Sequence, residues 1–149
     1  MPNRPNLAAA LPAEVISLAR AWRQLADQVL ASLNISNSTG YALLHLERLG
    51  DGARQADLAR AIGIAEASLV RTLQHLERAA LVQRRTDADD ARAKTLHLTA
   101  EGARLARLID ERLMDLRAEL LGGISDADLQ TAVDVLTLVS ERVAQKRPR

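Results

Sequence analysis

Two short helical segments joined by a glycine constrain the fold of this chain more than any other feature. The first segment covers residues 55–62 and ends at Gly63, and the second covers residues 66–77. In both segments the apolar residues recur at the spacing of one helical face, and glycine permits a tight turn between them. Ala59 is small at the point where the two helices would cross closely. The pattern predicts a helix-turn-helix unit.

The second helix of this unit has one apolar and one polar face. The residues expected to point inward, together with the turn residue before them, are Ile64, Leu69, Val70, Leu73 and Leu76. The residues left on the outside are Ser68, Arg71, Thr72 and His75. The second helix of such a unit is the one that enters the major groove in DNA-binding proteins. Its polar face is therefore the first candidate for a functional surface.

Directly after this unit the periodicity changes from helical to alternating. Residues 82–86 and 94–98 have the alternation of two short strands. The connection between them, residues 87–93, contains only polar, charged or small residues. A hairpin with a charged tip that follows a helix-turn-helix is a wing. The sequence therefore predicts a winged helix-turn-helix over residues 38–98.

Helical patterns also flank the winged unit. A stripe of apolar residues predicts a first helix over residues 13–33, with Pro12 in its first turn. Ser38 is the expected cap of the helix that follows. After the wing, Thr99 is expected to cap a helix that ends at residues 122–123.

A last helix is expected to open at a capping box of Ser125 and Asp128. The helical regions 13–33 and 99–146 are too long to pack fully on the winged unit, so their apolar stripes need another surface. A second copy of the chain would supply it. The expected fold is mainly α with a small β-hairpin wing, a single domain over residues 1–149 with long N- and C-terminal dimerisation helices.

The composition excludes several chemistries. The chain has no cysteine, which removes disulfides and thiolate metal sites, and it has no phenylalanine, so Leu, Ala, Val and Ile must form the core. His45, His75 and His97 stand on three different predicted elements, without the spacing of a metal site. We therefore expect no metal and no cofactor. No segment is long and apolar enough for a signal peptide or a membrane span, which favours a cytoplasmic protein with no membrane partner.

The motifs of this chain resemble those of the MarR family of winged helix-turn-helix transcription regulators, and within it the SlyA-like branch. The segments that carry the resemblance, in the order and spacing of the family, are Leu58-Ala59-Arg60-Ala61-Ile62-Gly63-Ile64, Ser68-Leu69-Val70-Arg71-Thr72-Leu73, Leu76-Glu77, Leu81-Val82, Asp90 to Lys94 and Leu98-Thr99. The order of the predicted helices agrees from about residue 13 to residue 145.

The resemblance implies a DNA interface made of the second helix and the wing. It places Ser68, Arg71 and Thr72 in the major groove and Arg92 in the minor groove. An arginine can bind guanine with two hydrogen bonds, and an arginine on a narrow tip suits the negative potential of a narrow minor groove. The remaining candidates for DNA contact are the strand residues Arg85 and Lys94. Asp87, Asp89 and Asp90 make the wing unusually acidic.

The family resemblance also implies an effector site. Members often respond to small aromatic carboxylates or phenols, in a pocket where the first, second and fifth helices meet the winged unit. In this chain that region is expected to contain Trp22, Arg23, Tyr41 and His45, which offer flat apolar faces, a cation and a phenol. The implied function is a homodimeric, sequence-specific regulator, a ligand-responsive repressor of an inverted-repeat operator on double-stranded DNA.

Two other functions are weighed against this one. A winged-helix module that docks a protein partner without reading bases would need neither Arg71 nor Arg92, and it would show no salt-dependent binding to DNA. A small helical enzyme would need a clustered acid, base or nucleophile. His45 and Glu47 point apart on a helix and have no nucleophile beside them, so we expect no enzyme.

Overall fold

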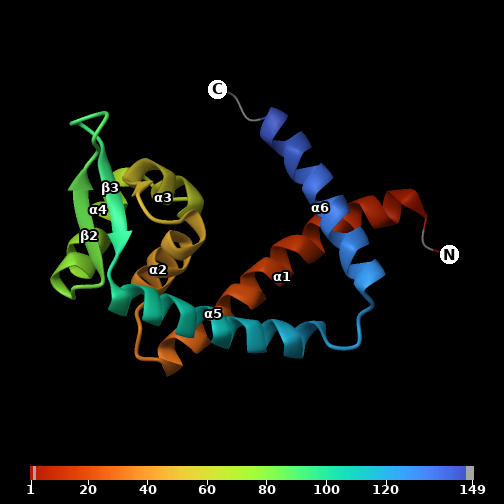
Figure 1. The fold of residues 1–149 in the computed structure, drawn as a ribbon. Helices are drawn as coiled ribbons and strands as arrows, with labels where there is room; N and C mark the ends of the chain where they lie inside the picture. The colour runs from red at the N-terminus through yellow and green to blue at the C-terminus, as the bar shows by residue number, and fades with distance from the viewer. Residues whose placement is uncertain (2, 147–149) are drawn as a thin grey trace. The chain divides into compact units, whose positions relative to one another are not determined.

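The computed structural model describes residue 1 and residues 3–146. It divides into two compact units, Met1–Asp115 and Leu116–Arg149. The elements, labelled in Figure 1, are α1 (Arg4–Ser32), α2 (Asn37–Leu49), β1 (Ala53–Arg54), α3 (Gln55–Ile62), α4 (Glu66–Arg78), β2 (Val82–Thr86), β3 (Lys94–Leu98), α5 (Ala100–Leu121) and α6 (Asp126–Lys146). The first unit contains a winged helix-turn-helix, as the sequence predicts.

The three strands form one small antiparallel sheet in the order β1-β3-β2. The hairpin of β2 and β3 pairs Val82 with Leu98 at its base and Thr86 with Lys94 at its far end. The predicted wing is thus confirmed with its predicted strand bounds. The third strand, β1, was not expected because two residues carry no periodicity. It pairs with β3 through Ala53 and Leu96 and ties the start of α3 to the wing.

The turn between α3 and α4 has the predicted geometry. Gly63 adopts the left-handed conformation (φ 84°, ψ 32°) that closes helix α3. The backbone N–H groups of Gly63 and Ile64 both donate to the carbonyl of Ala59, at 2.9 and 3.0 Å. Leu69, Leu73 and Leu76 are fully buried. The prediction that Ile64 points inward is wrong, since this turn residue is 40% exposed.

Helix α1 begins nine residues before the expected position. Asn3 caps it, its side chain accepting the N–H of Asn6 at 3.1 Å, and Pro5 occupies the first turn, where a proline is tolerated. The placement of Pro12 in the first turn is therefore wrong, because Pro12 lies inside the helix. The alanine- and leucine-rich segment before Pro12 favours helix strongly enough to continue past the missing backbone donor.

Three further helix starts are defined by side-chain caps. Ser36 rather than the expected Ser38 caps α2, and its Oγ accepts the N–H of Thr39 at 3.3 Å. Thr99 caps α5 as expected, accepting the N–H of Gly102 at 3.0 Å. The predicted capping serine of α6 is also confirmed, since the Oγ of Ser125 accepts the N–H of Asp128 at 3.1 Å.

The core of the first unit is built almost entirely of leucine. Its fully buried large side chains are Leu30, Leu43, Leu46, Leu58, Leu69, Leu73, Leu76, Leu96 and Ile109. The first turn of α5 packs on the chain before the wing so closely that a Cβ at Gly102 would lie 2.0 Å from the carbonyl oxygen of Leu81. Glycine is therefore required at this position, and the contact fixes α5 against the base of the wing.

Large apolar side chains remain exposed on the terminal helices. On α1 they include Ile16 and Leu18, at 60% and 58% exposure. On α6, in the second unit, none of the described side chains is buried, and the exposed apolar ones are Val133, Val135, Leu136, Leu138, Val139 and Val143. None of the helices in the described part of the chain combines the length and hydropathy needed to cross a membrane.

Candidate nucleic-acid interface

Helix α4 presents the polar face that the sequence predicts. Ser68, Arg71 and His75 are exposed, and Thr72 is half-buried. The apolar residues of the opposite face anchor the helix in the core, so the backbone under these polar side chains is fixed. Within the part of the chain that the structure describes, the side chain of Arg71 makes no hydrogen bond or ion pair. All five of its N–H donors are thus available to a partner.

The two arginines of β2 have different environments. Arg84 forms a 2.7 Å ion pair with Glu77 at the end of α4, and both side chains are mostly covered. Arg85, on the other face of the strand, is exposed and donates to the Oε1 of Gln83 at 3.0 Å. Only Arg85 therefore presents its charge outward, as the alternation of a strand predicts.

The acidic residues of the wing organise its loop. Asp87 receives the backbone N–H of Asp89 on its side chain at 2.9 Å and donates its own N–H to the carbonyl of Ala93 at 3.0 Å. Asp90 accepts the backbone N–H of Arg92 at 3.0 Å. Short carboxylates stabilise tight turns by such local bonds. The unusual acidity of this wing therefore has a structural use, and the loop presents Arg92 from an ordered backbone.

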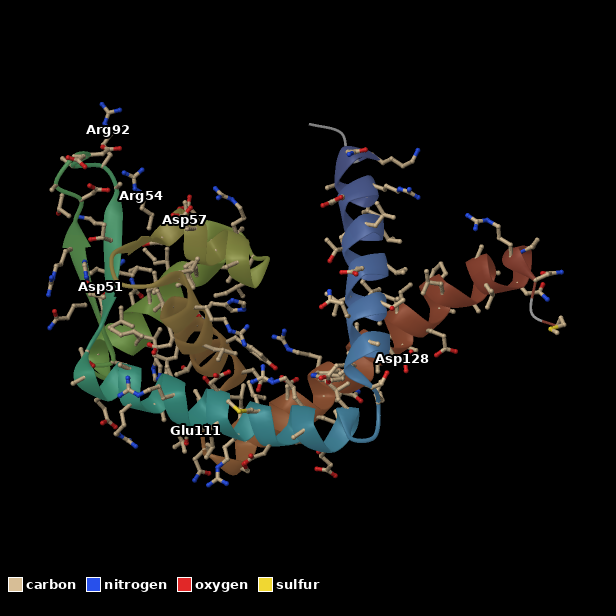
Figure 2. The ribbon with its side chains drawn as sticks, turned by 45° about the vertical axis from the view of Figure 1, so that its right-hand side comes forward. Asp51, Arg54, Asp57, Arg92, Glu111 and Asp128 are labelled. Atoms are coloured by element: carbon tan, nitrogen blue, oxygen red, sulfur yellow. The ribbon has the colours of Figure 1, made fainter. Side chains whose placement is uncertain are left out.

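The cations of the wing lie at its far end. Arg92 projects from the tip, away from the rest of the protein, in Figure 2. Its side chain has no hydrogen-bonding or ionic partner in the described residues. Lys94 is exposed at the start of β3, where its Nζ donates to the Oγ1 of Thr86 at 3.0 Å.

Sequence reasoning missed one cation at this end of the molecule. Arg54 of β1 binds Asp87, with Nη2 at 2.9 Å and Nε at 3.1 Å from the same carboxylate oxygen. The backbone bond from Asp89 is the main cause that lowers the pKa of Asp87 below its usual range, and Arg54 adds to it. Arg54 and Asp87 are 33 residues apart in the chain. The contact could have been predicted only from the pairing of β1 with β3, and the periodicity of the sequence does not indicate that pairing.

Comparisons with known proteins agree with this geometry. A model of the MarR family matches residues 33–93, the stretch that contains the helix-turn-helix and most of the wing. The solved transcriptional regulator PA3341 is 30% identical, over 91% of this chain and 99% of that one, with a TM-score of 0.83. The chain belongs to the MarR family of transcription regulators.

Two further solved structures of regulators are similar to this MarR family chain. MepR of S. aureus in its complex with DNA is 26% identical over 87% of this chain and 96% of that one, with a TM-score of 0.72. The transcriptional regulator SlyA is 20% identical over 91% of this chain and 94% of that one, with a TM-score of 0.76. At that identity the likeness to SlyA concerns the fold.

The structure brings two of the four residues expected at the effector site, Arg23 and Tyr41, into contact. Tyr41 of α2 is buried and donates its hydroxyl to the Oδ1 of Asp27 at 2.8 Å. Arg23 of α1 lies over the Tyr41 ring, 3.5 Å from its centroid, and pairs with Asp27 at 3.4 Å. Burial is the main cause that raises the pKa of Tyr41 to about 12, and the bond to Asp27 adds to it.

His45 and Trp22 complete the expected set. His45 is half-buried, one turn after Tyr41 on α2. Burial is the main cause that lowers its pKa below the usual value, and the positive charges of Arg48 and Arg23 add to this effect. His45 is therefore neutral at neutral pH. Trp22 is half-buried next to Arg23 in the chain.

The other two histidines lie elsewhere. His97 of β3 approaches Asp51 at 2.8 Å through Nδ1 and Thr95 at 3.0 Å through Nε2. His75 is exposed on α4. Across the described residues, no group of three or more His, Asp or Glu side chains is placed to hold a metal ion.

Proposed function

We propose that the chain is a homodimeric, ligand-responsive repressor that binds an inverted-repeat operator. The observation that carries the proposal is the exposed, uncommitted guanidinium of Arg71 on a helix whose backbone is fixed by the core, beside a wing whose tip exposes Arg92. Two cations presented by two rigid neighbouring elements suit the two adjacent grooves of a duplex. The MepR relative, solved with DNA, supports the same use of this fold.

The proposal gives each of the exposed side chains a role. Arg71 reads a guanine edge in the major groove, and Ser68 and Thr72 bond bases or phosphates beside it. Arg92 enters the minor groove. Arg85 and Lys94 bind phosphates from the two strands of the wing.

The dimer is supported by the exposed apolar side chains of α1 and α6. Such stripes are unfavourable in water unless a partner covers them. The regions 13–33 and 99–146 are therefore assigned to dimerisation and residues 38–98 to DNA binding. Two-fold symmetry would set the recognition helices about 34 Å apart, one turn of DNA, and so match an inverted repeat.

Ligand response is assigned to Arg23 and Tyr41, which are in contact, together with His45, one turn after Tyr41 on α2, and Trp22, the residue before Arg23. An aromatic acid would stack on an aromatic face and place its carboxylate on Arg23 in competition with Asp27, which now holds that cation at 3.4 Å. Such a ligand lowers DNA affinity only by the difference between its affinities for the two states of the dimer. An effector with a dissociation constant in the millimolar range would still lower DNA affinity if it binds only one of these states.

Salt-dependent binding tests the DNA-binding function. We expect the affinity for duplex DNA to fall steeply as salt is raised, because bound phosphates release counterions. A protein-docking module would show no binding to duplex DNA at low salt. That result would overturn the proposal.

Tryptophan fluorescence tests the effector site, because Trp22 is the only tryptophan of the chain. Aromatic acids such as salicylate are titrated into the protein–DNA complex while emission and DNA affinity are followed. We expect a change in Trp22 emission together with a fall in affinity, and Arg23→Gln should weaken both. If no aromatic acid changes either quantity at millimolar concentration, the effector assignment fails.

A further inference from the structure

A groove of about 320 Å³ lies between the wing and the start of α3. Its lining includes Arg54 of β1, Arg92 of the wing loop and Lys94 of β3. Three basic residues thus border one hollow, although the side chain of Arg92 projects outward from the wing tip. The first residue of α4, Glu66, contributes the only carboxylate among the lining residues. Figure 2 shows Arg54 just below the wing tip that carries Arg92, at the same end of the molecule.

Arg54 is held in place by Asp87, which binds only one edge of its guanidinium group. Its Nε and Nη2 both point to Asp87, whose side chain is only 11% exposed and is itself fixed by the N–H of Asp89. The Arg54 side chain is 52% exposed. With one edge of the guanidinium on a carboxylate, the Nη1 side remains able to bind a second anion, since guanidinium has five donors.

The residues that line the groove carry three positive charges and one negative charge. Asp87 is offset by Arg54, and Asp90 uses a carboxylate oxygen in the turn of the wing loop. Lys94 donates to a neutral hydroxyl, so its charge is not offset by that bond. Asp87, Asp89 and Asp90 of the wing loop are not among the lining residues and oppose binding from outside the groove, whereas Glu66 is the only carboxylate of the lining itself.

We propose that this groove seats a backbone phosphate of the bound DNA and that Arg54 is a phosphate-binding residue. The inference rests on the proposed DNA-binding function. The groove is bordered by the first residue of the recognition helix and by the tip of the wing, so a strand contacted by both elements passes over it. Phosphate contacts of this kind fix the register of a protein on the duplex.

The test compares two arginine variants on a short duplex of random sequence, whose phosphates are bound independently of the operator. Removing one phosphate contact is expected to lower the slope of log affinity against log salt concentration by about 0.9. We expect this loss in Arg54→Gln. Arg60→Gln is the matched control: Arg60 lies on neighbouring α3, 78% exposed and paired with Asp57, outside the groove, and its loss should leave the slope unchanged.

Two further variants separate phosphate binding from a role in folding. Arg54→Lys keeps the charge and should retain most of the slope, although it loses the paired bond to Asp87. Asp87→Asn should retain the slope but weaken binding at each salt concentration, because Arg54 is no longer held. Thermal unfolding of each variant confirms that it folds.

The outcomes distinguish this inference from the proposed function. If wild-type protein binds DNA with a salt slope that Arg54→Gln does not change, the phosphate site is wrong and DNA binding stands. If Arg54→Gln and Arg60→Gln lower the slope equally, the effect is one of net charge and the site is also wrong. If the wild-type protein does not bind the duplex at low salt, both fail.

Discussion

Nη2 of Arg84 lies 2.7 Å from a carboxylate oxygen of Glu77, and this ion pair joins the last turn of α4 to the first strand of the wing. The two side chains are 28% and 31% exposed, so the pair is partly shielded from solvent. It ties together the two elements that are assigned to neighbouring grooves of DNA. Arg85, the next residue, has no carboxylate partner among the described residues.

Arg84→Ala is therefore expected to destabilise the fold more than Arg85→Ala. Loss of Arg84 should lower the free energy of unfolding by about 1 kcal/mol, the upper end for a pair that is only partly buried. Arg85→Ala is the matched control and should change it by less than about 0.5 kcal/mol, as surface substitutions usually do. Chemical denaturation measures both values. Equal effects would show that the ion pair does not couple the helix to the wing.

Substitutions of Arg71 and Arg92 should change DNA binding in two different ways, one in specificity and the other in overall affinity. Arg71→Ala is expected to lose roughly 1 to 3 kcal/mol of discrimination between operator and scrambled DNA, because a paired base contact disappears. Arg92→Ala should weaken binding to both duplexes with little change in the preferred major-groove bases. Binding curves on both duplexes across a salt series measure this. Unchanged operator affinity in both variants would mean that the recognition surface is elsewhere.

The apolar side chains of α6 should hold a dimer together at micromolar concentration. Leu136 is 43% exposed in the single chain. Leu136→Glu is expected to shift the protein toward monomer, because a charge on a covered apolar stripe is costly to desolvate. Arg142→Glu serves as a charged control on the same helix. Sedimentation of the wild-type protein as a stable, folded 16.2 kDa monomer would contradict the dimer.

The ionisation of Tyr41 can be followed without interference from other tyrosines, since it is the only tyrosine of the chain. Folding raises its pKa from 10.0 to about 12, so the folded state holds the phenol proton more tightly than the unfolded state does. Its contribution to stability is therefore fully present below about pH 10 and is lost as the pH rises toward 12.

Absorbance of the tyrosinate measures this pKa directly. Asp27→Asn should lower it, because the hydroxyl then loses a charged acceptor, whereas Arg23→Gln should raise it further, because the phenolate loses a neighbouring cation. A wild-type titration near pH 10 would show that Tyr41 is not held as described.

Local patterns were sufficient to predict most of the fold. The turn at Gly63, the capping residue Thr99 and the bounds of both wing strands all depend on short segments with a distinct periodicity or a required backbone angle. The errors occurred where local signals compete. Ser36 and Ser38 are equally good caps, and Pro12 is a signal for a helix start that competes with the helix-forming residues before it.

The candidate interface was predicted less completely. The exposed face around Arg71 follows from helical periodicity, because residues on one face share their exposure. Arg54 could not be found in this way, since its position depends on a contact with Asp87 across the sheet. The same applies to Tyr41 and Asp27, where two helices bring together residues 14 positions apart.

Selection of DNA fragments by the purified protein tests the central claim most directly. Genomic fragments retained by the protein are sequenced and searched for a shared site. We expect an inverted repeat whose half-sites are centred about 10 base pairs, one helical turn, apart. Fragments without a shared sequence, or with a single unrepeated half-site, would contradict a dimeric, sequence-specific regulator.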